Sequence, residues 1–452
     1  MDKLDGVVEL NQLKANTYIN GIDEVNHLTA TTYNSGFQEA HDTYNALSIA
    51  SDGNIYYVLS SDQIHVGGKM YLLDPKTDKT EFLGDLTEIC GEKEQMFIPQ
   101  GKSHVRFYER NRKLYFSTHV GYYELINGMD RLPVNPPAGY KLYPGGCFLS
   151  YDMKTRVFEK LALVPNGEGV VSMTMDHERG HIYGISWPYG NFIHYDLDKN
   201  ELKDLGRTSA NGEAGQPGDD FRSLCRSLVV DPFDGTVYFS TSEGDIFSYN
   251  PEEGRINKLL DVNLRLDYFG KYDPTKPGSM SYNWRKVFWY KPEGLAYGVH
   301  GNSGYLFSFD PKKSKIELVR RITSEPSAKS GMLDYFSYGY LGFQLGPDGK
   351  TIYYLTGGPV YVDGKRVTGQ SEIAKGAAKG LENLHLITYN IPEGKYQDHG
   401  PIFYPNGDRP LYVNSIAVAD GGEVYALARI TEEGHTRTDL IKIPDPFKKK
   451  LL

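Results

Sequence analysis

The chain has 452 residues, a formal net charge of −9 and three cysteines. An acidic balance argues against general attraction to nucleic acid or anionic membranes, and three cysteines are too few for a disulfide framework. The sequence contains 35 Tyr, 20 Phe and 49 Gly, a composition that favours strands joined by tight turns.

One short motif recurs along the chain: an apolar residue, a tyrosine, and two or three small or apolar residues. In chain order the seven copies read IYYVLS, LYFSTH, IYGISW, VYFSTS, AYGVHG, IYYLTG and VYALAR. Their tyrosines are Tyr56, Tyr115, Tyr183, Tyr238, Tyr297, Tyr353 and Tyr425. A turn cluster and an alternating run precede each copy, and two more runs follow it, so each copy predicts a four-stranded antiparallel unit. Repeated units of this kind predict an all-β fold, a seven-bladed β-propeller with the tyrosines packed between blades.

The sequence between the copies contains no domain linker, so we expect a single domain over 1–452. The seven blades are expected over 44–448, and residues 1–43 form an N-terminal arm that could close the ring. Insertions interrupt the period at 124–146, 209–220, 263–283 and 362–383. Ordered loops of this length are often functional.

Aligning the copies on their tyrosines predicts which side chains face the channel of the propeller. The start of the first strand and the end of the second strand of each blade should open on one face. Two histidines, His104 and His119, occupy both of these positions in the second blade. The other residues expected at this channel mouth are Asn45, Trp187, Tyr189, Arg222, Arg226, Glu243, Arg285, His300 and Asn414.

These side chains suit a sugar that carries a carboxylate. Arginine binds a carboxylate through two parallel hydrogen bonds, tryptophan stacks on sugar faces, and histidine and tyrosine transfer protons. A structural interpretation stands beside this one: each histidine could be a hydrogen-bonded channel residue, and Arg226 and Arg285 could bridge blades.

The segment GKSHVRFYERNRKLYFSTHVGYY, with its Gly-Lys-x-His and Thr-His pairs, resembles the seven-bladed propeller polysaccharide lyases. These include ulvan lyases and rhamnosyl-glucuronate lyases, together with related α-L-rhamnosidases that act on rhamnose linked to glucuronate. The resemblance implies a carbohydrate-active enzyme that cleaves a rhamnose/uronic-acid linkage in an acidic polysaccharide or oligosaccharide by β-elimination. It implies His104 and His119 as the catalytic pair. It also implies a catalytic tyrosine, for which Tyr189 is a candidate, and an arginine, with Arg207, Arg222 and Arg226 as candidates.

Two other functions are consistent with the same sequence. A rhamnosidase of this group would use a histidine near the N-terminus, either His27 or His41. Hydrolysis usually needs two carboxylates, whereas Glu243 stands alone at the predicted mouth. The third hypothesis is a non-catalytic propeller that binds a glycan or a protein.

Cofactor, partner and location follow mainly from the resemblance. The elimination requires no cofactor, but Cys225 and His300 come from neighbouring blades and could hold a structural zinc, as in some ulvan lyases. We expect an acidic glycan as the partner, neither nucleic acid nor membrane, and a monomer. The resemblance implies a secreted or periplasmic protein, although MDKLDGVVEL shows no signal-peptide pattern.

Overall fold

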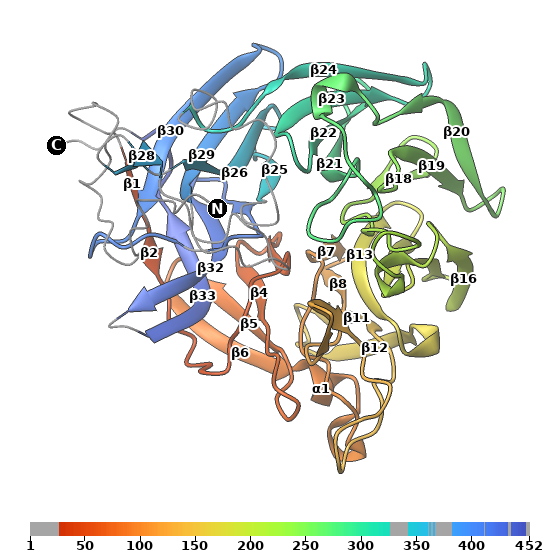
Figure 1. The fold of residues 1–452 in the computed structure, drawn as a ribbon. Coiled ribbons are helices and arrows are strands. Elements are labelled where there is room, and N and C mark those ends of the chain that lie inside the picture. Colours follow the sequence, from red (N-terminus) through yellow and green to blue (C-terminus); the bar gives the residue numbers. More distant parts are fainter. Residues whose placement is uncertain are drawn as a thin grey trace.

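The computed structural model describes residues 27–325, 342–359, 361–362, 365–366, 382–410, 412–432 and 435–448. Seven blades, each built on antiparallel strands, surround a central channel, as Figure 1 shows. The expectation of an all-β, seven-bladed propeller is confirmed. In the described ranges the α-helical structure is a single turn, α1 (Leu86–Ile89), and none of the helices there is long and apolar enough to cross a membrane.

The first five blades have their strands in chain order from the channel outward. The first three blades are β3 (Leu47–Ile49), β4 (Ile55–Leu59), β5 (Lys69–Asp74) and β6 (Lys79–Asp85); β7 (Tyr108–Arg110), β8 (Lys113–Ser117), β11 (Cys147–Asp152) and β12 (Phe158–Leu163); and β13 (Gly169–Asp176), β14 (His181–Trp187), β15 (Asn191–Asp196) and β16 (Glu201–Arg207). The fourth and fifth are β17 (Val229–Val230), β18 (Val237–Ser240), β19 (Asp245–Asn250) and β20 (Arg255–Asn263); and β21 (Trp284–Tyr290), β22 (Leu295–His300), β23 (Tyr305–Asp310) and β24 (Lys315–Arg321).

The last two blades include strands from the N-terminal arm. The sixth comprises β25 (Phe343–Leu345), β26 (Thr351–Pro359), β29 (Glu382–Asn390) and β30 (Lys395–Phe403), with β1 (Leu28–Thr29) parallel to β30. The seventh comprises β31 (Ala417–Val418), β32 (Val424–Glu432) and β33 (His435–Ile443), with β2 (Thr31–Thr32) as its outer strand. Segments from both ends of the described chain thus lie in one sheet.

The repeated tyrosines lie on the second strand of every blade and are all buried. Rings meet across blade boundaries: the centroids of Tyr183 and Tyr249 lie 6.0 Å apart, and those of Tyr238 and Phe309 lie 5.5 Å apart. Burying each ring removes a large apolar surface from water and stabilises the fold by about 2 kcal/mol. This explains why the motif marks the blades.

Residues 27–43 of the expected arm connect three blades. After β1 and β2, the Ser35 N–H and hydroxyl donate to the Asp439 carboxylate of the seventh blade at 2.7 and 2.8 Å. The Tyr33 hydroxyl donates to Asp78 of the first blade at 2.7 Å. The arm therefore joins the last blades to the first, and residues 1–26 lie outside the described ranges.

The predicted insertions contribute ordered structure around the channel. The first contains the hairpin β9 (Glu124–Ile126) and β10 (Met129–Arg131), and the second contains the 3-10 turn Gly212–Ala214. The third contains the 3-10 turn Asp267–Phe269. The insertion expected at 362–383 lies largely outside the described residues.

Candidate functional site

A cavity of about 590 Å³ opens on the face where the first strands begin and the second strands end. We call it the main cavity. Three of the insertions contribute to its wall, through Leu125 with Asn127, Gly128, Met129 and Asp130, through Glu213, and through Pro277 with Gly278. Its polar and aromatic lining residues are Asp42, Tyr44, Asn45, Lys102, His104, His119, Tyr123, Asn127, Asp130, Trp187, Glu213, Phe221, Arg226, Arg285, Tyr412 and Asn414.

The second blade brings His104 and His119 together. The residue pair Lys102 and His119 forms an isolated antiparallel bridge, with N–H to carbonyl distances of 3.1 and 2.8 Å. This pairing places the His104 and His119 ring centroids 4.5 Å apart. The juxtaposition follows from antiparallel neighbours, whose opposite ends meet at one edge of the sheet.

The hydrogen bonds of His119 define its tautomer. Nδ1 lies 2.9 Å from the carbonyl oxygen of Val120, and because a carbonyl only accepts, Nδ1 carries the proton. Nε2 then presents a lone pair, is buried, and has no hydrogen-bond partner among the described residues. Burial, reinforced by the charge of Lys102, holds the pKa of His119 well below its usual value. The site thus contains a neutral imidazole with an unused acceptor.

The pKa of His104 is also held well below its usual value. Burial is the largest cause, followed by the neighbouring His119 and by Lys102. Its ring lies 4.3 Å from that of Tyr44, centroid to centroid. Both histidines are therefore neutral near pH 7.

Lys102 lies between two phenol rings. Its Nζ donates to the Tyr44 hydroxyl at 2.9 Å and lies 4.2 and 4.4 Å from the ring centroids of Tyr44 and Tyr123. Burial is the first cause that raises the pKa of each phenol well above its usual value. Both tyrosines therefore remain protonated, and the Tyr44 oxygen accepts a hydrogen bond from the Lys102 ammonium.

Glu213 organises the part of the wall that adjoins His119. Its carboxylate accepts from Trp187 Nε1 at 2.9 Å, from the guanidinium of Arg226 at 2.6 Å and from the Leu224 N–H at 3.0 Å. The Trp187 ring lies 5.2 Å from that of His119. The indole and the imidazole therefore lie side by side in the lining of the main cavity.

Several residues expected at the mouth lie at the main cavity, and others lie outside its lining. Asn45, Arg285 and Asn414 line it with the histidine pair, Trp187 and Arg226. Arg222 instead pairs with Glu243 at 2.7 Å. Tyr189 is 40% exposed and carries the Arg207 guanidinium 4.7 Å above its ring.

The candidate histidines of the arm also lie outside this lining. The His41 side chain is 41% exposed, with Nε2 3.4 Å from the Asp62 carboxylate. His27 precedes β1 at the outer edge of the sixth blade and contacts Phe403 edge-on, with ring centroids 5.8 Å apart. Neither is oriented by the groups that orient His119.

The predicted zinc ligands make other contacts. The Cys225 thiol donates to the Ser227 carbonyl at 3.1 Å, while His300 stacks on Phe269 at 4.0 Å and its Nδ1 lies 2.8 Å from the Ser303 hydroxyl. Burial lowers the pKa of His300 to about 3.

A different cluster in the described chain could supply metal ligands. Cys90, Glu92 and Cys147 are buried, and their ligand atoms lie within 4.8 Å of one another. Two thiolates and a carboxylate suit a thiophilic cation. However, Glu92 already accepts from Gln100 Nε2 at 2.9 Å and from Lys160 Nζ at 3.4 Å, and the cluster has three protein ligands rather than the four of a closed zinc site.

Sequence reasoning missed several residues of the main cavity. Tyr44, Lys102 and Tyr123 lie within four residues of the registered positions Asn45, His104 and His119, so a wider window would have found them. Glu213 and Asp130 come from insertions and carry no periodic signal.

Comparison with protein-family models gives no match, and no curated protein matches the sequence. Among solved structures, a chain from the mitotic checkpoint complex aligns over 93% of this chain and 95% of its own, with a TM-score of 0.51 and 10% identity. An oligogalacturonate lyase in complex with manganese aligns over 93% and 97%, with a TM-score of 0.47 and 13% identity. A putative 6-phosphogluconolactonase from Bacteroides uniformis aligns over 82% and 93%, with a TM-score of 0.42 and 10% identity. At these identities the likeness concerns the fold alone, and the seven blades themselves define the class as that of β-propeller proteins.

Proposed function

We propose that this propeller is a polysaccharide lyase that cleaves a rhamnose/uronic-acid linkage in an acidic polysaccharide or oligosaccharide. The observation that carries the proposal is His119, a neutral buried imidazole whose Nε2 lone pair has no partner among the described residues. It lies in one cavity with Lys102, Arg226 and Arg285. A neutral imidazole is suited to remove a proton from the carbon next to a carboxylate, and nearby cations acidify that proton by neutralising the carboxylate.

In the proposed elimination, His119 Nε2 takes the C5 proton of the uronate. The C5–H electron pair passes into an enolate-like intermediate, which Lys102 and Arg285 stabilise. The C4–O bond then breaks, the C4=C5 double bond forms, and the departing oxygen takes a proton. Tyr44 is the proposed donor, because its raised pKa keeps it protonated and the Lys102 ammonium at 2.9 Å would stabilise its phenolate.

The rhamnosidase alternative uses His27 or His41, neither of which lines the main cavity, and hydrolysis within the cavity would need its carboxylates, Asp42, Asp130 and Glu213. Two of these already have arginine partners: Asp42 pairs with Arg429, and Glu213 pairs with Arg226. Such pairing favours the ionised carboxylate, whereas a general acid needs a protonated one. This observation favours elimination over hydrolysis.

The test follows two products in one reaction. The protein is incubated with ulvan and with rhamnose-capped arabinogalactan oligosaccharides, while ultraviolet absorbance reports the unsaturated uronate and chromatography reports free rhamnose. We expect the absorbance to rise without release of free rhamnose. Free rhamnose alone would support the hydrolase, and binding with neither product would support the non-catalytic propeller.

A further inference from the structure

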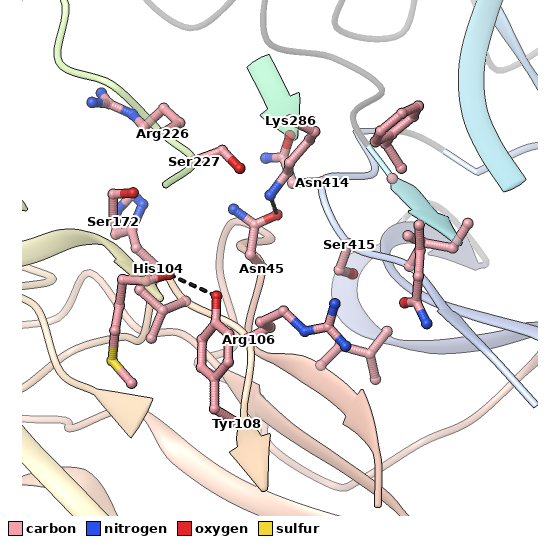
Figure 2. Close-up of a pocket in the computed structure, with 17 residues that line it drawn as sticks. Asn45, His104, Arg106, Tyr108, Ser172, Arg226, Ser227, Lys286, Asn414 and Ser415 are labelled. Carbon is pink, nitrogen blue, oxygen red and sulfur yellow. Dashed lines mark hydrogen bonds between the residues drawn. The ribbon is translucent and has the colours of Figure 1, made fainter. Parts of the chain in front are cut away.

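A second, smaller cavity lies in the channel next to the main cavity. We call it the channel pocket; it encloses about 70 Å³ and is shown in Figure 2. Asn45, His104, Arg226 and Asn414 line both cavities, so one group of side chains separates them. The volume admits a few water-sized groups and is too small for a sugar ring.

The charged side chains around the channel pocket are cationic. Lys286 of β21, Arg106 and Arg226 contribute to its lining, and no Asp or Glu occurs among the described residues that line it. The Lys286 Nζ donates to Asn45 Oδ1 at 2.5 Å, the contact drawn in Figure 2. Arg226 has its carboxylate partner, Glu213, in the wall of the main cavity. The pocket therefore concentrates positive charge in a restricted volume.

A buried hydroxyl lies in the same pocket without a hydrogen bond. Ser172, on β13 of the third blade, is 2% exposed, and its Oγ has no partner among the described residues. Figure 2 shows Ser172 on the His104 side of the pocket. A buried polar atom without a partner costs free energy unless a ligand or water satisfies it. A hydroxyl beside cationic groups can donate to an anion.

We infer that the channel pocket binds a compact oxyanion, with the Lys286 ammonium and the Ser172 hydroxyl as its central donors. The chemical class is a carboxylate, sulfate or phosphate group, either as a free ion or as a substituent of a sugar held in the main cavity. The site is independent of whether His119 performs catalysis, because none of its donors belongs to the proposed proton-transfer step.

Anion binding is coupled to protonation of Lys286. Burial, with the charges of Arg285 and Arg106, holds the pKa of Lys286 well below its usual value in the empty pocket. His104 lines the same pocket and is neutral, so a bound anion raises the pKa of His104 as well, whereas Arg106 and Arg226 are protonated with or without the anion. A bound anion raises the pKa of Lys286, and binding therefore takes up protons and weakens as pH rises.

The experiment titrates the full chain with sodium sulfate by isothermal calorimetry at low ionic strength. Two buffers that differ in ionisation enthalpy report the proton uptake. We expect saturable binding with proton uptake, weakened at least about tenfold by Lys286→Met and less by Ser172→Ala, the loss expected for a charge-assisted hydrogen bond. Lys291→Met, a change of an exposed lysine, is the matched control and should bind normally.

A second titration distinguishes the two sources of the anion. Glucuronate is added to protein saturated with sulfate. If glucuronate displaces sulfate, the natural anion is a sugar carboxylate that reaches the channel pocket. If both bind at once, the natural anion is a free ion. Absence of saturable sulfate binding to the wild type would overturn the inference, as would unchanged affinity in both folded variants. Ser172→Ala retains every charge, so it keeps the test valid if Lys286→Met fails to fold. Because turnover is not measured, failure of the lyase proposal is a separate result.

Discussion

Removal of the His119 imidazole separates a catalytic role of this residue from a structural one. His119→Ala deletes Nε2 but leaves the backbone bridge to Lys102, at 3.1 and 2.8 Å, intact. The Val120 carbonyl loses the Nδ1 donor but keeps the Tyr123 hydroxyl at 2.9 Å. We therefore expect the free energy of unfolding to fall by only about 1–2 kcal/mol, the size of one hydrogen bond and a small cavity.

The expected loss of turnover is far larger. Removing a general base typically lowers kcat by about 10²–10⁴-fold, and the ultraviolet assay on a rhamnose/uronate substrate measures it directly. His177→Ala is the matched control, because it removes an imidazole that is exposed. His177 follows the last residue of β13, whereas Gly169 and Val170 begin that strand. Full activity of folded His119→Ala protein would refute the assignment.

The pH profile supplies an independent check on the same residue. Because burial keeps the pKa of His119 well below its usual value, the base is already unprotonated at neutral pH. The rate should therefore stay level as pH falls through about 6.5, the usual pKa of histidine, and decline only in more acidic solution. An acidic limb centred near the usual pKa would contradict the burial argument.

Three further predictions concern stability and charge. Burial lowers the pKa values of His194, His300 and His399 to about 4, 3 and 4. The stability that these neutral histidines contribute is therefore fully present above the pKa of histidine in the unfolded chain and is lost as pH falls below it. Thermal unfolding should show a loss of about 1 kcal/mol for each residue by roughly pH 5.5. Asp439→Ala removes the acceptor of both Ser35 donors and should lower the free energy of unfolding by about 3 kcal/mol, measured by urea titration. An unchanged midpoint of the titration would show that the arm contributes little to stability. Arg226→Ala should weaken binding of a glucuronate oligosaccharide by about tenfold or more in calorimetry and flatten its salt dependence, and insensitivity to both would exclude it as a carboxylate anchor.

The sequence was sufficient to predict the blades because their signal is periodic. Each tyrosine lies on a second strand, and registering the copies brought His104, His119, Asn45 and Asn414 to one cavity. These residues are fixed by backbone pairing within a blade, which a repeat alignment represents directly.

The remainder of the site depends on loops that no repeat describes. His300 ends β22, as His119 follows β8, yet Phe269 of the 263–283 insertion stacks on it. Glu213 reaches Trp187 and Arg226 from the 209–220 insertion. Where a loop folds back depends on tertiary contacts rather than local pattern, so equivalent positions in different blades acquire different surroundings.

The arm that spans the last two blades also imposes an order on biosynthesis. Ser35 and Asp439 are 404 positions apart, and β2 pairs with β33. A ribosome delivers the N-terminal segment first, so this segment must wait unpaired until almost the entire chain has emerged. Until then the growing propeller is an open arc with an exposed strand edge, a surface that chaperones or neighbouring nascent chains can engage. Completion of the ring is thus a late and long-range event, and we expect it to set the pace of maturation.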